Sequence, residues 1–422
     1  MLQAPKAATN VRVNAERLWS RHMEIARIGA IEGDGSCRLA MTAEDAAARA
    51  LFAGWCEKAG LAMSFDRAGN MYAVREGAEA GRPLVGSGSH LDTQPHGGRF
   101  DGVSGVLAAL EVVETLNDAG ITTLSPLAVI NWTNEEGVRY APGLLGSSWY
   151  SGLLGEAEMA QVRAADGTLF DDEARLRGWL GGAADRPDLG AFIELHIEQG
   201  PVLSREGLKI GIVSSVQGLS WLDVEVSGTD GHAGTVPLDQ RQDALLAAAR
   251  MLVGLNEAGR ACGPDARVSV GRLDTATNGP STIVGHASFV VDIRHPDAAT
   301  LARLKAQCAE LCRSAGAATG CAVTVSERIA VPPVQFDDHC VRALEDAAIG
   351  LGYSNRRLSS GALHDASNVA RVAPTAMVFV PCRDGISHNV NEYASPEDLA
   401  AGADVLLHAL LKLAGVPGDA AA

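Results

Sequence analysis

Short apolar segments that end abruptly in polar side chains are the feature that most constrains the fold of this chain. One segment ends in SHLDT and delivers His90, another ends in WTNEEG and delivers Glu135 and Glu136, and a third, within ELHIEQG, delivers His196. Segments with helical periodicity lie between them, and strands that alternate with helices favour a layered α/β architecture. Because ligands bind beyond the carboxyl ends of strands in such sheets, we expect these side chains to meet at one edge.

Other local signals define the elements around these strands. Residues 14–28 carry apolar side chains at helical spacing, and a second helix begins after Thr42 and stops before Gly60. The segments LAMSFD and MYAVRE, joined by RAGN, predict a β-hairpin. Ser395 and Pro396 begin a final helix that has two acidic residues in its first turn.

The pattern changes between about residues 212 and 328. Six segments there follow the order β-α-β-β-α-β, which is typical of a small independent α+β domain. They are 221–226, 239–258, 267–273, 287–294, 297–315 and 322–326. The whole chain, at 422 residues, is longer than the roughly 250–300 residues at which single cores stop growing. We therefore predict an α/β catalytic domain, residues 1–211 and 329–422, with a mixed sheet and helices on both faces, interrupted by an inserted α+β domain, residues 212–328.

Charge and cysteine content exclude several classes of protein. The net charge of −16 argues against nucleic acid and anionic membranes as partners. No apolar stretch approaches the roughly 18 residues that a membrane span needs, and the first residues lack the apolar core of a signal peptide, so we expect a cytoplasmic protein. The eight cysteines contain no C-x-x-C pair and are expected to be free thiols.

The polar residues at the strand ends have the composition of a centre for two divalent cations. Such a centre needs about five protein ligands, including a bridging carboxylate, and an open position for water. The available side chains are His90, Asp101, Glu135, Glu136, His196 and His388. One glutamate is then spare, and it is suited to take a proton from water and return it to a leaving nitrogen. A single histidine of this kind is more often structural, and a glutamate pair is usually solvated. The metal centre is therefore indicated only by the whole set in this order.

Eight motifs make the chain resemble a known family. They are GSHLDT, FDGVSGVLAALE, NEEGVRY, IELHIEQGPVL, GHAGTVPLDQRQDAL, DIRHPD, SGALHDA and SHNVNEY. Together they resemble the hydantoinase/carbamoylase family of metal-dependent amidases, which includes N-carbamoyl-L-amino-acid hydrolases, β-ureidopropionases and allantoate amidohydrolases. This family belongs to the aminoacylase and metallo-carboxypeptidase clan, and the similarity runs from about Asn14 to Leu413.

The resemblance implies a role for each metal-competent residue. One cation would be held by His90, Asp101 and His196, and the other by Asp101, Glu136 and His388, with Asp101 bridging. Glu135 would act as the general base and then as the acid, and Asp92 would orient the His90 ring. The cations implied are Zn²⁺ or Mn²⁺, with Co²⁺ or Ni²⁺ also suited to this donor set.

The resemblance also implies how substrate is held. Arg294 would bind the substrate carboxylate, although an arginine at a strand end is otherwise an ordinary surface residue. His232 would stabilise the oxyanion, in its own subunit or in the neighbouring one. Gln199 and the backbone of Gly361 would contact substrate. The inserted domain would act as a lid and would form a homodimer.

One segment departs from the family pattern. Where the family has an asparagine just before an IPG turn, this chain has NGPSTIVG, which places Ser281 in register and Asn278 three residues earlier. We predict Asn278 as the substrate contact, with Ser281 as the alternative. The departure leaves the identity of the substrate open.

The predicted activity is hydrolysis of the ureido C–N bond of a small carboxylate substrate, such as an N-carbamoyl amino acid, N-carbamoyl-β-alanine or allantoate, with release of ammonia and carbon dioxide. An N-acyl amino-acid deacylase or an aminopeptidase of the same clan is the alternative, disfavoured because those enzymes more often have a carboxylate where this chain has His196. A non-catalytic metal-binding relative is a further alternative, disfavoured because every expected ligand and Glu135 are present.

Overall fold

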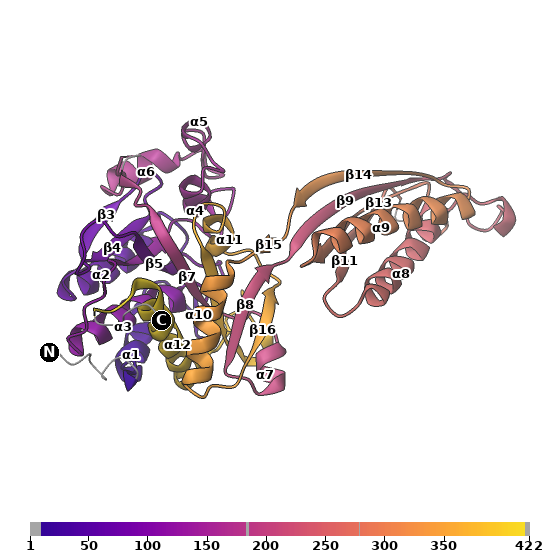
Figure 1. Cartoon of the computed structure of the whole chain (residues 1–422). Coiled ribbons are helices and arrows are strands. Elements are labelled where there is room, and N and C mark those ends of the chain that lie inside the picture. The colour runs from indigo at the N-terminus through magenta and orange to yellow at the C-terminus, as the bar shows by residue number, and fades with distance from the viewer. Residues whose placement is uncertain (1–9, 183–184, 278, 418–422) are drawn as a thin grey trace. The chain divides into compact units, whose positions relative to one another are not determined.

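The computed structural model describes residues 10–182, 185–277 and 279–417, and it divides the chain into two compact units. The first unit comprises Met1–Ser214 and Phe336–Ala422, and the second comprises Ser215–Gln335. Figure 1 labels many of the helices and strands of both units. Among the described residues, no helix has both the length and the apolar character needed to cross a membrane.

A mixed β-sheet forms the centre of the first unit. Its strands follow the order β15-β8-β17-β7-β5-β6-β4-β3, and β16 pairs with β8. The strands are β3 (Ala62–Phe65), β4 (Met71–Arg75), β5 (Leu84–His90), β6 (Leu127–Trp132), β7 (Leu189–Ile197), β8 (Ile210–Val216), β15 (Val334–Gln335), β16 (Asn355–Ser360) and β17 (Thr375–Val380). The pairs β6–β5, β5–β7 and β7–β17 are parallel, whereas the outer pairs β3–β4, β4–β6 and β17–β8 are antiparallel.

The parallel centre of the sheet brings the polar strand ends together. In the register of the ladders, His90 lies opposite Trp132, and His196 lies opposite Phe379. Every residue of β5 and β6 is buried, as expected for parallel strands covered on both faces. The carboxyl ends of β6, β5, β7 and β17 therefore meet at one edge, as expected for a doubly covered sheet.

Helices cover both faces of this sheet. The helices of the first unit are α1 (Ala15–Ile25), α2 (Ala43–Lys58), α3 (Val103–Asp118), α4 (Leu145–Tyr150), α5 (Glu156–Met159), α6 (Phe170–Leu176), α7 (Val202–Glu206), α10 (Asp338–Gly350), α11 (Asp365–Val369) and α12 (Pro396–Ala414). Gly105 of α3 and Gly402 of α12 both lie close against Leu195 of β7, whereas the neighbouring Glu194 binds the backbone of α11. Since successive side chains of a strand point to opposite faces, α3 and α12 cover one face and α11 covers the other.

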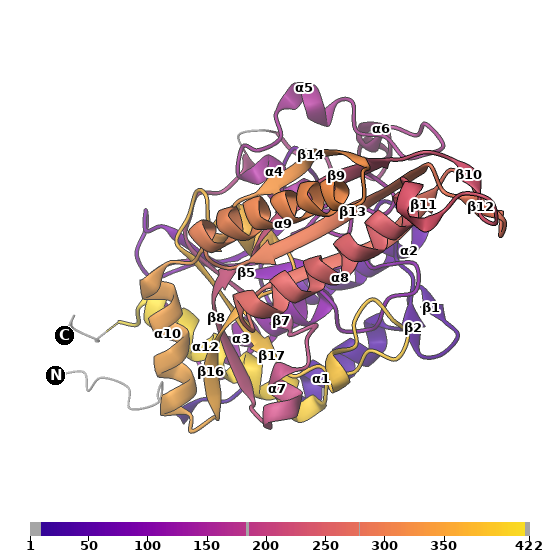
Figure 2. The ribbon, with the colours of Figure 1, turned by 90° about the vertical axis from the view of Figure 1, so that its right-hand side faces the viewer.

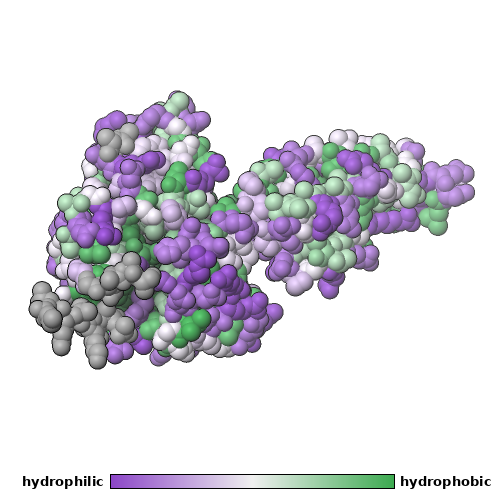
Figure 3. All heavy atoms as spheres, in the orientation of Figure 1, coloured by the Kyte–Doolittle hydropathy of each residue, from purple (hydrophilic) through white to green (hydrophobic). Residues whose placement is uncertain are grey.

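The core of the first unit lies between these helices and the sheet. Its largest fully buried side chains include Trp132, Tyr72 and Phe192. On the face of the molecule drawn in Figure 3, hydrophilic and hydrophobic residues are interspersed. The mixed α/β class predicted from the sequence is thus confirmed.

The second unit is an antiparallel sheet covered by two helices. The strands β9 (Gly218–Ser227), β11 (Arg267–Thr275), β13 (His286–His295) and β14 (Ala322–Val331) follow the order β11-β13-β9-β14. The helices α8 (Ala244–Cys262) and α9 (Ala298–Ala318) pack together against it, as Figure 2 shows, and bury alternate side chains of β9 and β13. A short ribbon of β10 (Gly231–His232) and β12 (Thr282–Ile283) completes the described part of the unit.

Most predicted elements are present, with shifted ends. The predicted hairpin is β3 and β4, Thr42 accepts a hydrogen bond from the Asp45 N–H at the start of α2, and Ser395 caps α12. The helix expected from residue 239 begins only at Ala244, because the Asp243 side chain accepts the Leu246 N–H and so fixes the start there. Residues Leu238–Gln240 instead form a single 3₁₀ turn, η3.

Candidate metal centre

Two groups of potential metal ligands lie at the carboxyl edge of the central sheet. His90, Asp101 and His196 form one group, and Asp101, Glu136 and His388 form the other. Within each group the ligand atoms lie within 4.8 Å of one another. His90 ends β5, His196 lies in β7, and the other three residues lie in loops that follow β5, β6 and β17.

Asp101 belongs to both groups because its two oxygens face different partners. Its Oδ1 lies 3.1 Å from the Nε2 of His196 and 3.8 Å from the Nε2 of His90. Its Oδ2 lies 3.3 Å from the Nε2 of His388. A carboxylate in this position has the geometry of a bridge between two cations.

The two buried histidines have their rings fixed by the backbone. His90 Nδ1 lies 2.9 Å from the carbonyl oxygen of Asp92, and His196 Nδ1 lies 2.9 Å from that of Ile197. Donation from Nδ1 leaves each Nε2 directed toward Asp101. Burial lowers the pKa of His90 to about 4, so its ring is neutral at pH 7. Burial is the largest single effect on His196 and disfavours its charged form, but the hydrogen bond with Asp101, the charges of Asp101 and Glu194 and the hydrogen bond to the Ile197 backbone together raise its pKa to about 9. A cation would therefore displace a proton there.

The glutamate pair lies in a turn that Asp92 supports. Asp92 accepts the backbone N–H of Glu135 on Oδ1 at 3.3 Å and that of Glu136 on Oδ2 at 3.2 Å. The hydrogen bond of Asp92 with the His90 ring comes from its backbone carbonyl and not from its side chain. Glu135 Oε2 lies 3.6 Å from His90 Nε2, and Glu136 Oε2 lies 3.6 Å from His388 Nε2. Adjacent glutamates thus face the two different ligand groups.

The electrostatics of this site favour bound cations. Burial, followed by the nearby carboxylates of Asp365 and Glu136, raises the pKa of Glu135 well above its usual value. Burial and the Asp101 carboxylate raise the pKa of Glu136 to about 8. Glu136 Oε2 accepts a hydrogen bond from Gln94, whereas its buried Oε1 has no hydrogen-bond partner among the described residues. Crowded buried carboxylates and an orphaned oxygen are the features that a divalent cation would satisfy.

Glu392, which no sequence pattern singled out, lies beside this centre and is 5% exposed. Its Oε1 accepts the backbone N–H groups of Phe100 and Asp101, both at 3.0 Å, and its Oε2 accepts the Ser387 hydroxyl at 2.9 Å. Burial and the Asp101 carboxylate raise its pKa to about 7. The only sequence signal was the single acidic residue of SHNVNEY, four positions after His388.

A third cluster shares one histidine with the first group. Glu194, His196 and His364 bring ligand atoms within 4.8 Å of one another. Both oxygens of Glu194 already accept hydrogen bonds, from the Ser89 hydroxyl at 2.7 Å and from the Ala366 N–H at 2.8 Å. Glu194 therefore holds β5 and the start of α11 together, and this cluster is the weaker metal candidate.

The structure places some of the predicted substrate contacts and not others. Gln199 donates from Nε2 to Asp101 Oδ2 at 2.9 Å, so it lies directly against the proposed bridge. Gly361 is exposed, in the turn that follows β16. Asn278 lies outside the described residues, and its alternative Ser281 is exposed in the second unit.

The second unit carries His232 and Arg294. His232 is exposed, and its Nδ1 accepts the backbone N–H of Gly234 at 3.0 Å, so the ring proton is on Nε2 when the ring is neutral. Arg294 binds Asp292 through Nε and Nη2, both at 2.9 Å, and Asp292 also accepts the indole N–H of Trp221 at 3.0 Å. The guanidinium is therefore held in one orientation on the sheet.

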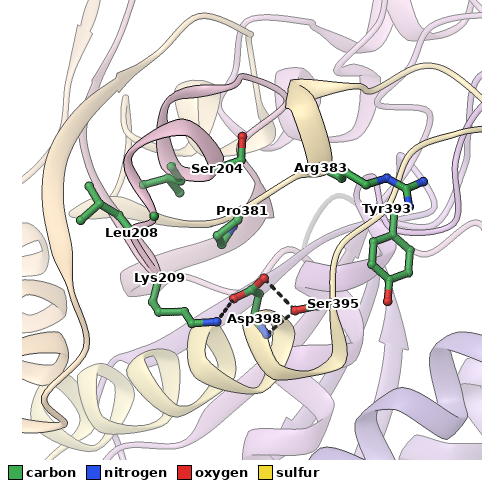
Figure 4. A pocket seen from close by; sticks show the side chains of 10 residues that line it. Ser204, Leu208, Lys209, Pro381, Arg383, Tyr393, Ser395 and Asp398 are labelled. Atoms are coloured by element: carbon green, nitrogen blue, oxygen red, sulfur yellow. Dashed lines mark hydrogen bonds and ion pairs between the residues drawn. The ribbon is translucent and has the colours of Figure 1, made fainter.

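A surface pocket of about 300 Å³ lies beside the segment that leads to His388. Figure 4 shows Lys209, Ser395 and Asp398 in it, with Asp398 binding both of the others. Arg383 stacks over the Tyr393 ring at 4.8 Å. None of the residues that line this pocket belongs to the two ligand groups.

Comparison with known proteins gives consistent matches over almost the whole chain. The model of peptidase family M20/M25/M40 matches residues 86–412. The N-carbamoyl-L-amino-acid amidohydrolase of Rhizobium meliloti is 44% identical over 413 residues, which cover 96% of this chain and 98% of that protein. The allantoate amidohydrolase of Bacillus subtilis is 31% identical over 393 residues, 92% of this chain and 95% of that protein. A hydantoinase/carbamoylase family amidase structure from Burkholderia multivorans has a TM-score of 0.93 at 42% identity, covering 96% of this chain and 98% of that one.

A substitution at Gly102 tests the centre without replacing any of its ligands. A Cβ atom there would lie 2.3 Å from His90 Cε1 and 2.4 Å from its Nε2, so Gly102→Ala must displace the His90 ring. We expect this variant to lose affinity for the first cation by about 10–100-fold, the usual loss when the support of a ligand is disturbed. Calorimetric titration of metal-free protein with Zn²⁺ measures this change.

Gly120→Ala is the matched control for that experiment. Gly120 has φ of +64°, against +65° for Gly102, but no atom lies within 4 Å of its Cβ position. It therefore imposes the same backbone strain, about 1 kcal/mol, without a clash. Equal metal affinity in the two alanine variants would contradict the proposed role of His90.

Proposed function

Because the chain belongs to peptidase family M20/M25/M40, and within it to the hydantoinase/carbamoylase amidases, we propose that it hydrolyses the ureido C–N bond of a small carboxylate substrate at a two-cation centre. The observation that carries this proposal is the position of Asp101, whose two oxygens each face one ligand group. The related proteins named above act on ureido compounds that carry a carboxylate, which supports this substrate class.

The donor set fits two borderline cations. We propose that His90, Asp101 and His196 hold one, that Asp101, Glu136 and His388 hold the other, and that the ions are Zn²⁺ or Mn²⁺, with Co²⁺ or Ni²⁺ also compatible. When bound, such cations acidify a water molecule and polarise a carbonyl oxygen. They would also favour the ionised form of the buried Glu135 and Glu136, whose pKa values are otherwise raised.

Glu135 is the residue we assign to proton transfer. It is 13% exposed and faces His90 and therefore the first ligand group, yet neither ligand group includes it, so its carboxylate remains available as a base. Glu135 takes a proton from the attacking water and delivers it to the nitrogen that leaves the carbamoyl carbon. The carbamate formed then decomposes to ammonia and carbon dioxide.

The second unit would supply substrate contacts. A guanidinium fixed by Asp292 is preorganised to bind a carboxylate, which supports Arg294 in that role. His232 with its proton on Nε2 can donate a hydrogen bond to an oxyanion, in its own subunit or in a partner subunit. Gln199, Asn278 and Gly361 remain proposed substrate contacts. We further propose that this unit acts as a lid and homodimerisation domain and that the enzyme is cytoplasmic.

A substrate panel tests the proposed reaction. The reconstituted protein is assayed for ammonia release from N-carbamoyl-L-amino acids, N-carbamoyl-β-alanine and allantoate, and for amine release from N-acetyl amino acids. We expect turnover of one ureido compound, abolished by a chelator and restored by Zn²⁺ or Mn²⁺. Turnover of the acetyl compounds alone would instead assign the protein to the deacylases.

Glu135→Gln tests the proton-transfer role. The amide has the same shape but cannot accept the proton from water, so we expect kcat to fall by about 10²–10⁴-fold. Metal content, measured by mass spectrometry of the dialysed protein, should stay at two ions per chain. Glu397→Gln removes a charge from an exposed glutamate of α12 and serves as the control, with full activity expected. A fully active Glu135→Gln enzyme would exclude Glu135 as the base.

Arg294→Lys tests carboxylate binding. Lysine keeps the charge but loses the paired N–H groups, so we expect KM to rise by about 10–100-fold with a smaller change in kcat, a loss of roughly 1.4–2.7 kcal/mol in binding. Arg328→Lys is the matched control, because Arg328 also makes a two-pronged pair, with Asp223 on the same sheet. Unchanged steady-state kinetics in Arg294→Lys, or an equal rise in KM in both variants, would remove Arg294 from the substrate site.

A further inference from the structure

Glu392 joins the two loops that supply Asp101 and His388. One oxygen of its carboxylate receives the Phe100 and Asp101 N–H groups, and the other receives the Ser387 hydroxyl. The side chain lies in a space that only glycine leaves open, since a Cβ at Gly98 would be 2.2 Å from Glu392 Oε1. A buried carboxylate bound to three donors from two ligand loops fixes the separation of those loops.

The hydroxyl of Ser387 has two possible acceptors. It lies 2.9 Å from Glu392 Oε2 and 3.2 Å from Asp101 Oδ2. Gln199 Nε2 donates to the same Asp101 oxygen at 2.9 Å and to the Ser387 oxygen at 3.1 Å. Because a hydroxyl has a single proton, a hydrogen bond to Glu392 and one to Asp101 compete with each other.

The competition matters because Asp101 Oδ2 is the oxygen that faces His388, at 3.3 Å. Asp101 Oδ2 has two lone pairs, and Gln199 Nε2 already donates to this oxygen. A hydroxyl proton directed at the same oxygen would compete with a cation for the remaining lone pair. A hydroxyl proton directed at Glu392 leaves that lone pair to the cation.

We propose that Glu392 is a positioning residue that accepts the hydrogen bond from the Ser387 hydroxyl and thereby keeps Asp101 Oδ2 available to the second cation. This inference rests on the two-cation centre proposed above. It concerns only the second ligand group, because within the described residues the Ser387 hydroxyl donates to Asp101 Oδ2 and not to Oδ1, which faces His90 and His196.

Glu392→Gln tests whether Glu392 sets the direction of the Ser387 hydroxyl proton or only holds the two loops together. The two backbone N–H groups of Phe100 and Asp101 need an oxygen acceptor, so the amide oxygen takes that place and the amide nitrogen faces Ser387. The nitrogen cannot accept the hydroxyl proton, which then turns to Asp101 Oδ2. We expect affinity for the second Co²⁺ ion to fall by about 10–100-fold while affinity for the first changes by less than about threefold.

The experiment is a Co²⁺ titration of metal-free full-length protein, followed by calorimetry and by the visible absorption of the bound ion. Glu111→Gln is the matched control, since Glu111 is buried and also accepts a backbone N–H, from Asn14, and a hydroxyl, from Thr115. It should keep both Co²⁺ affinities. Gly98→Ala displaces the Glu392 carboxylate without removing its charge and should weaken the second site in the same way.

The double variant Glu392→Gln/Ser387→Ala gives the decisive readout. Removing the hydroxyl removes the competing proton, so we expect the second affinity to recover to within about threefold of the wild type, whereas a loop that has merely lost its brace would not recover. Wild-type affinity in Glu392→Gln, or no recovery in the double variant, overturns this inference alone. Fewer than two Co²⁺ ions per wild-type chain overturns the two-cation centre and this inference with it.

Discussion

The burial of several carboxylates within reach of one another is the constraint on which the rest of the structure depends. Asp101, Glu135, Glu136 and Asp92 lie together at the end of the buried central strands, and apart from Asp101 their pKa values are raised, first of all by burial. Uncompensated, such charges destabilise a fold by several kcal/mol each. Histidines and backbone N–H groups offset part of that repulsion, and the proposed cations would offset what remains. Metal binding at this centre would then contribute to the folding free energy of the first unit.

The sheet topology explains why these groups meet although they are distant in sequence. Four parallel strands end at one edge, and each delivers a ligand or a ligand loop there. A parallel strand pair needs a long crossover, so the ligands are necessarily spread over some 300 residues, from His90 to His388. The close contacts are then set by small residues and backbone atoms: Gly102 and Gly98 leave room for His90 and Glu392, and backbone carbonyls fix the rings of His90 and His196.

The sequence was sufficient for the parts of this arrangement that carry a periodic or chemical signal. Apolar runs predicted buried strands, and Thr42 and Ser395 predicted the starts of two helices. Histidines after strands indicated the edge of the sheet where the structure brings them together. What the sequence could not reveal depends on three-dimensional contacts between residues without a pattern of their own. Asp92 reaches the glutamate turn with its side chain and His90 with its backbone, a division that no spacing rule predicts. Glu392 looks like any loop glutamate until its three donors are seen. Helix α8 begins later than predicted because Asp243 caps it at Ala244, although the helical pattern of the sequence starts earlier.

In the proposed function, selectivity for a carboxylate substrate would follow from the pairing of Arg294 with Asp292 in the second unit. In a chain of net charge −16, an unpaired guanidinium would attract anions of any shape, whereas Arg294 is already bound on one edge by Asp292. An incoming anion would bind tightly only if it formed paired hydrogen bonds with the same planar group, which has five N–H donors. Asp292, itself fixed by Trp221, thus lowers affinity for anions in general and keeps the guanidinium oriented for a planar carboxylate. The ureido part of the substrate must then be recognised elsewhere, and the segment NGPSTIVG, where this chain departs from its family, is where differences in that recognition are to be sought.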